Sequence, residues 1–174
     1  MKHKTSLNTP LSEYHGVPKG WFQSDILKRY IDLGGRSSIE PDVAAEPGAP
    51  SYLPDRYNWL QYRATLYEIA GGVKRRDKAF VELAIQYIEL DYFGSYSGFI
   101  RERFARLLKS ADLSLDQADR LMRHFESFAN SKHYLKEFRE YKKLWHKICQ
   151  DRQMPNNRRH LGGKKPRDTQ HISY

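Results

Sequence analysis

The stretch of sequence that decides the fold is residues 75–91, RRDKAFVELAIQYIELD. Its apolar side chains, from Phe80 to Ile88, cover more than half of the circumference of a helix rather than a single stripe. A helix that is apolar on most sides has to be surrounded by other helices. We therefore expect residues 75–91 to form the central helix of the fold.

Amphipathic helical patterns lie on both sides of this stretch, and several have a recognisable start or stop. Before it, Asp55 opens a helix that Gly71 and Gly72 end. After it, Ser114 and Gln117 form a capping box for a helix with a regular apolar stripe. The other predicted helices span residues 25–33, with Ser24 as N-cap and Gly34 as stop, residues 99–110 and residues 132–150.

Together these patterns predict an all-α protein, because we find no convincing alternation of apolar and polar residues typical of a strand. We expect a compact helical bundle of about four to five helices over residues 55–150. Residues 1–54, which contain a segment rich in proline and glycine, should form an N-terminal arm with one short helix and a linker. Residues 151–174 have almost no apolar content and should form a disordered, basic, flexible tail.

The composition limits the classes of protein to which the chain can belong. Its single cysteine, Cys149, excludes an intramolecular disulfide framework. The mean hydropathy is −0.81, and no apolar run approaches the roughly 20 residues that a membrane-spanning helix needs. No apolar segment typical of a secretory signal follows the basic N-terminus. We therefore expect a cytoplasmic protein that does not interact with membranes and that needs no cofactor or metal.

The positive charge is concentrated towards the C-terminal end of the chain. The 174 residues include 30 Lys plus Arg and 21 Asp plus Glu, and the net charge is +9. Residues 131–150 and 151–174 each carry +4. Basic residues of the last predicted helix recur every three or four positions and form one row, which comprises Lys132, Lys136, Arg139, Lys143 and Lys147. The tail adds Arg158, Arg159, Lys164, Lys165 and Arg167.

A rigid basic row that leads into a flexible basic tail is suited to the phosphates of a nucleic acid, because both can displace its counterions. The alternative is a solvated helix face, partly neutralised by pairs such as Glu140–Lys143. The helix predicted at residues 99–110 also carries Arg101, Arg103, Arg106 and Lys109. Their spacing spreads them over most of its polar side, so we interpret them as a solvated surface.

A second basic cluster lies at the start of the predicted central helix and comprises Lys74, Arg75, Arg76 and Lys78. Cations at the N-terminus of a helix oppose the helix macrodipole. A bound phosphate would offset this cost and would also accept hydrogen bonds from the free backbone N–H groups. A solvated turn is the alternative.

Aromatic residues outside the helical stripes are candidates for binding a partner. Tyr92, Phe93 and Tyr96 lie in a glycine-containing turn after the central helix, and Trp21 and Phe22 precede the first helix. Each group either packs back onto the core or serves as an anchor for a partner.

Glu82 and Glu89 share one face of the predicted central helix, and catalysis by them would require a metal. We interpret them instead as ion-pair partners of Arg63, Arg101 or Arg103. The sequence thus favours a small non-catalytic nucleic-acid-binding protein, an accessory subunit or regulator of a larger complex. The many aromatic residues favour RNA or single strands. The alternative is a protein-interaction module that binds a partner or a second copy of itself through residues 1–54.

Overall fold

The computed structural model describes residues 16–36, 56–94, 96–130 and 137–153. Over these ranges the chain forms helices and no strand, which confirms the all-α prediction. No helix in this part of the chain is both long enough and apolar enough to cross a membrane. The helices are α2 (Gln23–Asp32), α3 (Arg56–Lys74), α4 (Lys78–Glu89), α5 (Ser97–Leu108), α6 (Leu115–Asn130) and α7 (Phe138–Gln153).

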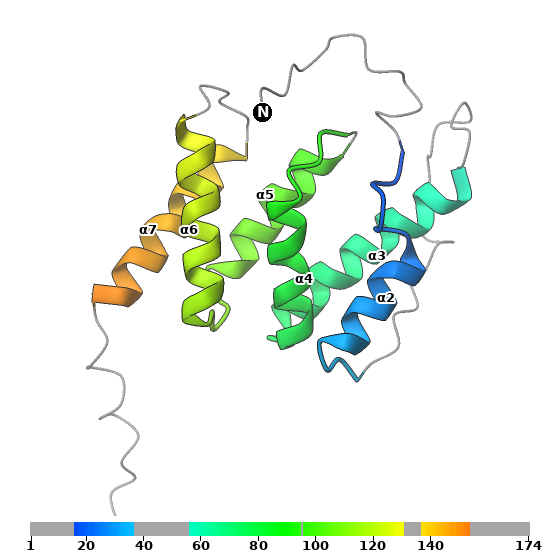
Figure 1. Cartoon of the computed structure of the whole chain (residues 1–174), viewed down its shortest axis with the longest axis horizontal. Helices are drawn as coiled ribbons and strands as arrows, with labels where there is room; N and C mark the ends of the chain where they lie inside the picture. The colour runs from blue at the N-terminus through cyan, green and yellow to red at the C-terminus, as the bar shows by residue number, and fades with distance from the viewer. Residues whose placement is uncertain (1–15, 37–55, 95, 131–136, 154–174) are drawn as a thin grey trace, which may run out of the picture.

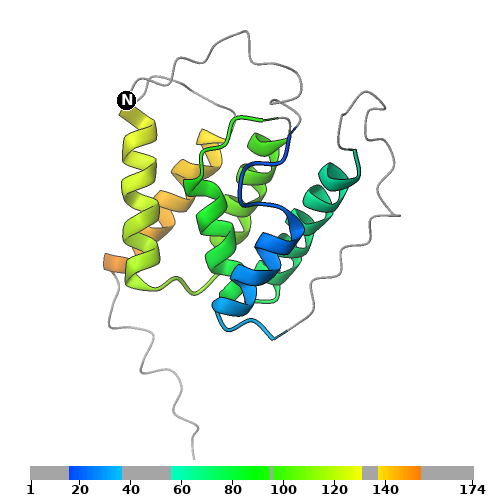
Figure 2. The ribbon, with the colours of Figure 1, turned by 45° about the vertical axis from the view of Figure 1, so that its right-hand side comes forward.

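These six described helices form two layers (Figure 1). Helices α2, α4 and α6 lie nearer the viewer, and α3, α5 and α7 lie behind them. Within the first layer α4 packs on α2 and α6, and within the second α5 packs on α3 and α7. The turned view keeps this order, with α6 and α7 at one end of the bundle and α2 and α3 at the other (Figure 2).

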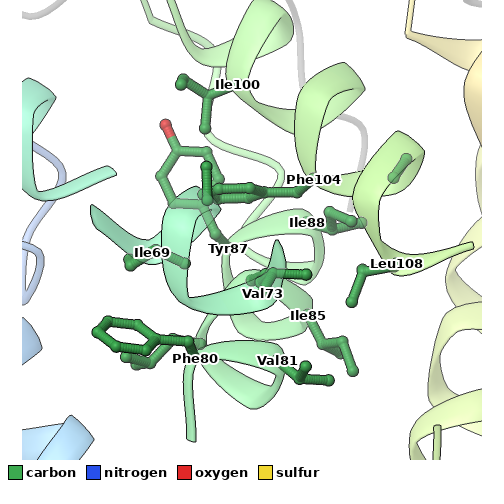
Figure 3. Close-up of a cluster of buried hydrophobic side chains, with 14 of the residues drawn as sticks. Ile69, Val73, Phe80, Val81, Ile85, Tyr87, Ile88, Ile100, Phe104 and Leu108 are labelled. Carbon is green, nitrogen blue, oxygen red and sulfur yellow. The ribbon is translucent and has the colours of Figure 1, made fainter. Parts of the chain in front are cut away.

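Helix α4 is the central helix, as its apolar circumference predicts. It packs on α2, α3, α5 and α6, and its side chains Phe80 and Tyr87 are buried. The Tyr87 ring meets that of Phe104 of α5 edge-on, with the ring centroids 5.5 Å apart, in the core between the layers (Figure 3). The hydroxyls of Tyr87 and Tyr62 share a hydrogen bond of 2.6 Å, and burial raises the pKa of Tyr87 to about 12. The core therefore lies between the two layers, with α4 at its centre.

Helix α3 does not end at Gly71 and Gly72, as the sequence predicts, but continues through both to Lys74. Gly72 is needed for a different reason. A Cβ atom on this residue would lie 2.0 Å from the nearest carbon of the Phe80 ring. The absent side chain thus lets α4 approach α3 closely, and the glycine serves packing rather than termination.

The turn between α3 and α4 is formed by Arg76 and Asp77. Arg76 has a left-handed backbone with a φ of 63°, and the N–H groups of both residues donate hydrogen bonds to carbonyls in the last turns of α3. The Asp77 carboxylate then accepts hydrogen bonds from two backbone N–H groups at the start of α4. The central helix therefore begins at Lys78 and not at Arg75, as we expected from the sequence.

Helix α2 contributes to this same core, although its sequence predicts that it belongs to an N-terminal arm. Trp21, Ile26 and Tyr30 are buried, and α2 packs on α3 and α4. The Tyr30 hydroxyl donates a hydrogen bond of 3.0 Å to Asp77, which joins α2 to the α3–α4 turn. Residues 1–15 and 37–54 of the predicted arm and residues 154–174 of the predicted tail lie outside the described residues.

The ends of α2 and α6 test three of the predicted caps. Ser24 does not cap α2: the helix begins at Gln23, two residues before the predicted start, and the Asp25 carboxylate accepts a hydrogen bond from the backbone N–H of the N-cap residue Phe22. Gly34 ends α2 as predicted, with a φ of 83°. The capping box of α6 is confirmed, because Ser114 and Gln117 each donate a backbone hydrogen bond to the side chain of the other.

Arg101 is a buried cation and not, as its spacing suggested, part of a solvated surface. It is 1% exposed, and its guanidinium lies 2.6 Å from the carboxylate of Glu137 and donates a second hydrogen bond to the carbonyl of Tyr92. A Cβ atom at Gly98 would lie 3.1 Å from this carboxylate. Burial disfavours the charge on Arg101, but Tyr141 and Glu137 outweigh it and raise its pKa. The pair joins α5 to the residue that precedes α7.

We expect Gly72→Ala to lower the free energy of unfolding by about 1–3 kcal/mol, because the new methyl group would overlap the Phe80 ring. Gly71→Ala is the matched control. Its Cβ would meet the flexible end of Arg75 at 3.2 Å, and alanine favours a helix over glycine by about 0.5–1 kcal/mol. Urea unfolding of both variants measures the difference. Equal stability of the two would contradict a close packing of Phe80 on Gly72.

Candidate nucleic-acid interface

The positive charge of the described helices is concentrated in one of the two layers. The sequences of α3, α5 and α7 carry net charges of +2, +2 and +3. Those of α2, α4 and α6 carry 0, −1 and −1. Because alternate helices share a layer, the charge separates across the thickness of the bundle. A surface with one sign of charge attracts polyanions and raises their local concentration.

Helix α5 lies in the middle of this basic layer and presents a row of three exposed side chains. Phe99, Arg103 and Arg106 are four and three residues apart, so they lie on one side of the helix. The buried Ile100 and Phe104 lie on the opposite side. We call Phe99, Arg103 and Arg106 the α5 row.

On the α7 side of this row, three cations surround the buried carboxylate of Glu140. The Glu140 side chain is 3% exposed and lies 2.6 Å from Lys143, 3.0 Å from Lys109 and 3.8 Å from Arg139. The hydrogen bond from Lys143 outweighs the effect of burial and, with that from Lys109, lowers the pKa of Glu140 to about 2. The predicted pair Glu140–Lys143 is thereby confirmed. The group retains a net positive charge, because three cations surround a single carboxylate.

On the α3 side of the row, cations alternate with aromatic rings. The Arg103 guanidinium lies 5.0 Å from the centroid of the Tyr67 ring, and that of Arg63 lies 4.6 Å from the Tyr96 ring. The hydroxyls of Tyr67 and Tyr96 share a hydrogen bond. These contacts join α3 to α5. The exposed side of the α3–α5–α7 layer is therefore continuous across its helices, and we call it the basic face.

The second predicted cluster lies at the α3–α4 turn and comprises Lys74, Arg75, Arg76 and Lys78. Lys74 follows Tyr67 by seven residues, close to two turns, and so lies on the same side of α3 as the basic face. Lys74 and Arg75 lie at the C-terminal end of α3, where positive charge interacts favourably with the macrodipole of that helix. Asp77 caps the N-terminus of α4. The electrostatic cost that would favour a bound phosphate at this turn is therefore smaller than the sequence suggests, although Lys78 remains at the first position of α4.

The structure describes three members of the basic row predicted for the last helix: Arg139, Lys143 and Lys147, all on α7. Their side chains are exposed to 76%, 51% and 33%, and Lys147 forms an ion pair with Asp151. Accessibility to a phosphate thus decreases towards the end of α7. The other predicted nucleic-acid-binding residues lie outside the described ranges, and these are Lys132, Lys136, Arg158, Arg159, Lys164, Lys165 and Arg167.

The aromatic residues predicted to bind a partner occupy different environments. Trp21 is 3% exposed and belongs to the core, which corrects its interpretation as a surface anchor. Phe22 and Phe93 are exposed. Tyr92 is half-buried, and its hydroxyl donates a hydrogen bond to a carbonyl in the segment before α2. Tyr96 alone among them belongs to the basic face.

Glu82 and Glu89 are ion-pair partners, but not of the arginines of α3 and α5 that we suggested from the sequence. Arg120 of α6 binds both, at 2.7 Å to Glu82 and with a hydrogen bond of 2.9 Å to Glu89. The hydrogen bonds with Glu89 raise the pKa of Arg120 above its ordinary value. No group of His, Cys, Asp and Glu that could hold a metal occurs among the described residues. Glu82 and Glu89 therefore join α4 to α6 through Arg120.

The sequence prediction of the site misses the α5 row and its neighbours Arg63 and Tyr67. The signal in the sequence is the spacing of Phe99, Arg103 and Arg106, which places them opposite the apolar residues of α5. Arg101 obscures this signal, because a fourth cation on the same helix gives the impression of charge on all polar sides.

No protein-family model, no curated protein and no solved structure matches this chain.

The low pKa of Glu140 predicts a specific dependence of stability on pH. Because the pKa is about 2 in the folded state and 4.5 is its ordinary value, the ion pairs of Glu140 stabilise the fold fully above pH 4.5. This contribution is lost as the pH falls towards 2. We expect Glu140→Gln to lower the free energy of unfolding by about 1–2 kcal/mol at neutral pH, and the difference should shrink on acidification.

Urea unfolding between neutral pH and the acid limit measures this difference, with Glu126→Gln, an exposed carboxylate of α6, as control. If Glu140→Gln lowers the free energy of unfolding by the same amount at every pH, this would contradict the stabilisation of the charged carboxylate by Lys109 and Lys143.

Proposed function

We propose that this chain binds nucleic acid through its phosphates, on the basic face of the α3–α5–α7 layer. The observation that carries this proposal is the separation of charge between the two layers. The helices of one layer carry +2, +2 and +3, of which the buried and paired Arg101 accounts for one charge of α5, and those of the other carry 0, −1 and −1. Such a separation orients a polyanion towards one side of the protein. The binding role suits an accessory subunit or regulator rather than a catalyst.

The arrangement of cations along the face supports phosphates as the ligand. Arg106 of α5 and Arg139 and Lys143 of α7 are exposed, and they belong to helices that pack side by side. Cations that follow neighbouring helices can contact successive phosphates of one strand, and each contact releases condensed counterions. The affinity should therefore depend steeply on salt concentration.

We expect the double variant Arg139→Gln, Lys143→Gln to weaken the binding of a labelled RNA oligonucleotide and to reduce its salt dependence. Each lost phosphate contact should lower the slope of log affinity against log salt by about 1. Fluorescence anisotropy between about 50 and about 200 mM salt measures this slope. The matched control is Lys19→Gln, Lys28→Gln, which removes the same charge from exposed positions on and before α2.

Two results would count against the proposal. The first is an absence of binding by the full chain at low salt. The second is an equal loss in the two double variants, because this would reflect the net charge of the chain and not the basic face. Substitution of the tail cations by glutamine in the full chain separates the contribution of residues 154–174 from that of the helices.

A protein-interaction module is the second candidate, because α2 and its ends carry exposed apolar side chains. Phe22, Ile31 and Leu33 are 39%, 58% and 39% exposed. Under this alternative, residues 1–54 bind a protein partner or a second copy of the chain. Ile31→Ser with Leu33→Ser should then abolish self-association in sedimentation experiments and leave oligonucleotide binding unchanged. Deletion of residues 1–15 tests the preceding segment without removing the buried Trp21.

A further inference from the structure

Phosphate binding does not explain why the rings of Phe99, Tyr96 and Tyr67 lie together at one end of the basic face, which we call its aromatic end. The Phe99 side chain is 53% exposed, and its ring centroid lies 5.2 Å from that of Tyr96. The Tyr96 ring in turn lies 6.1 Å from that of Tyr67. Three rings therefore follow one another across the boundary between α3 and α5, and one of them is open to solvent. Clustered exposed aromatic rings are a common mark of an interaction surface.

Two arginines hold these rings and bring positive charge to them. Arg63 lies 4.6 Å from the centroid of the Tyr96 ring, and Arg103 lies 5.0 Å from that of Tyr67. Such cation–π contacts fix the planes of the rings. Aromatic surface and positive charge therefore occur together in a surface that is already ordered.

The backbone of Tyr96 is a further sign that the position of its ring matters. This residue precedes α5 with a left-handed φ of 74°. An aromatic residue seldom adopts this conformation, which glycine or asparagine would adopt at lower cost. The hydrogen bond with Tyr67 and the contact with Arg63 hold Tyr96 in it. Strained residues that are fixed in this way concentrate at ligand-binding sites.

We propose that the aromatic end of the basic face binds the unpaired bases of a single-stranded nucleic acid. A base stacks on the exposed ring of Phe99, with Tyr96 beside it. Arg103 and Arg106, about 6 Å and about 10 Å further along the axis of α5, contact the phosphates that follow. This inference rests on the proposed function, because it names the form of nucleic acid that the basic face prefers.

The exposed Phe99 ring distinguishes single strands from duplexes, because it binds nucleic acid by stacking on unpaired bases. Every unpaired base offers an aromatic face, so stacking on Phe99 tolerates any sequence. In a duplex the bases already stack on each other, and only phosphates remain for the cations of the face. The cations therefore bind the phosphates of single strands and of duplexes, whereas Phe99 binds single strands alone.

The test compares the full chain with Phe99→Ala for two probes of equal length, a labelled oligouridylate and a mixed-sequence RNA duplex. We expect the variant to bind the oligouridylate about tenfold more weakly and the duplex with unchanged affinity. Phe22→Ala is the matched control, since it removes another exposed phenylalanine from the N-cap of α2, a helix that does not pack on α5. Phe99→Trp should retain the preference, and its fluorescence should change with the oligouridylate but not with the duplex.

The outcomes separate this inference from the proposed function. Binding of both probes with no effect of Phe99→Ala, or with an equal loss for both, overturns the stacking site and leaves phosphate binding intact. An absence of binding to either probe at low salt overturns the proposed function itself. A parallel measurement with oligodeoxythymidylate shows whether the site binds single-stranded DNA as well as single-stranded RNA. A tenfold loss for either the RNA or the DNA strand supports the inference, because both carry unpaired bases.

Discussion

The enclosure of α4 is the constraint on which the rest of this structure depends. Its apolar side chains cover most of its circumference, so their burial requires neighbours from both layers. Helices α2 and α6 supply these neighbours within one layer, and α3 and α5 supply them from the other. The close approach of Phe80 to Gly72 sets the distance between the layers at the α3–α4 turn. With α4 enclosed in this way, α5 lies between α3 and α7, and its polar side becomes the middle of the exposed basic face.

Features of the fold that depend on local spacing could be predicted from the sequence, and features that depend on distant contacts could not. The burial of α4 and the cap formed by Ser114 follow from periodicity and from a short motif. Gly72 looks like a helix stop because its contact with Phe80, in the next helix, is not visible in a local pattern. For the same reason the sequence misses the burial of Arg101 and leaves that of Trp21 open, since both side chains are buried by contacts with distant parts of the chain.

The sequence predicts the candidate site only where a single helix carries its residues. The spacing of Arg139 and Lys143 places them on one side of α7, and the structure finds them there. The significance of Phe99 arises from rings and cations on a second helix, which no spacing within α5 reveals. The sequence does contain one non-local clue. Basic helices alternate along the chain with neutral or acidic ones, and short connections bring alternate helices into one layer, so the alternation itself predicts a bundle with one basic side.

The hydrogen bond between Tyr30 and Asp77 has a consequence for the order in which this chain folds. It joins residues 47 apart, and closing the long connection between α2 and α3 costs conformational entropy. Helices α3 to α7 pack on near neighbours in the chain, which favours their earlier assembly. We therefore expect helix α2 to dock last, with the Tyr30 ring 4.3 Å from that of Phe80. In the native state the same helix is the natural unit of local unfolding, and its release uncovers Phe80 while the opposite layer stays assembled.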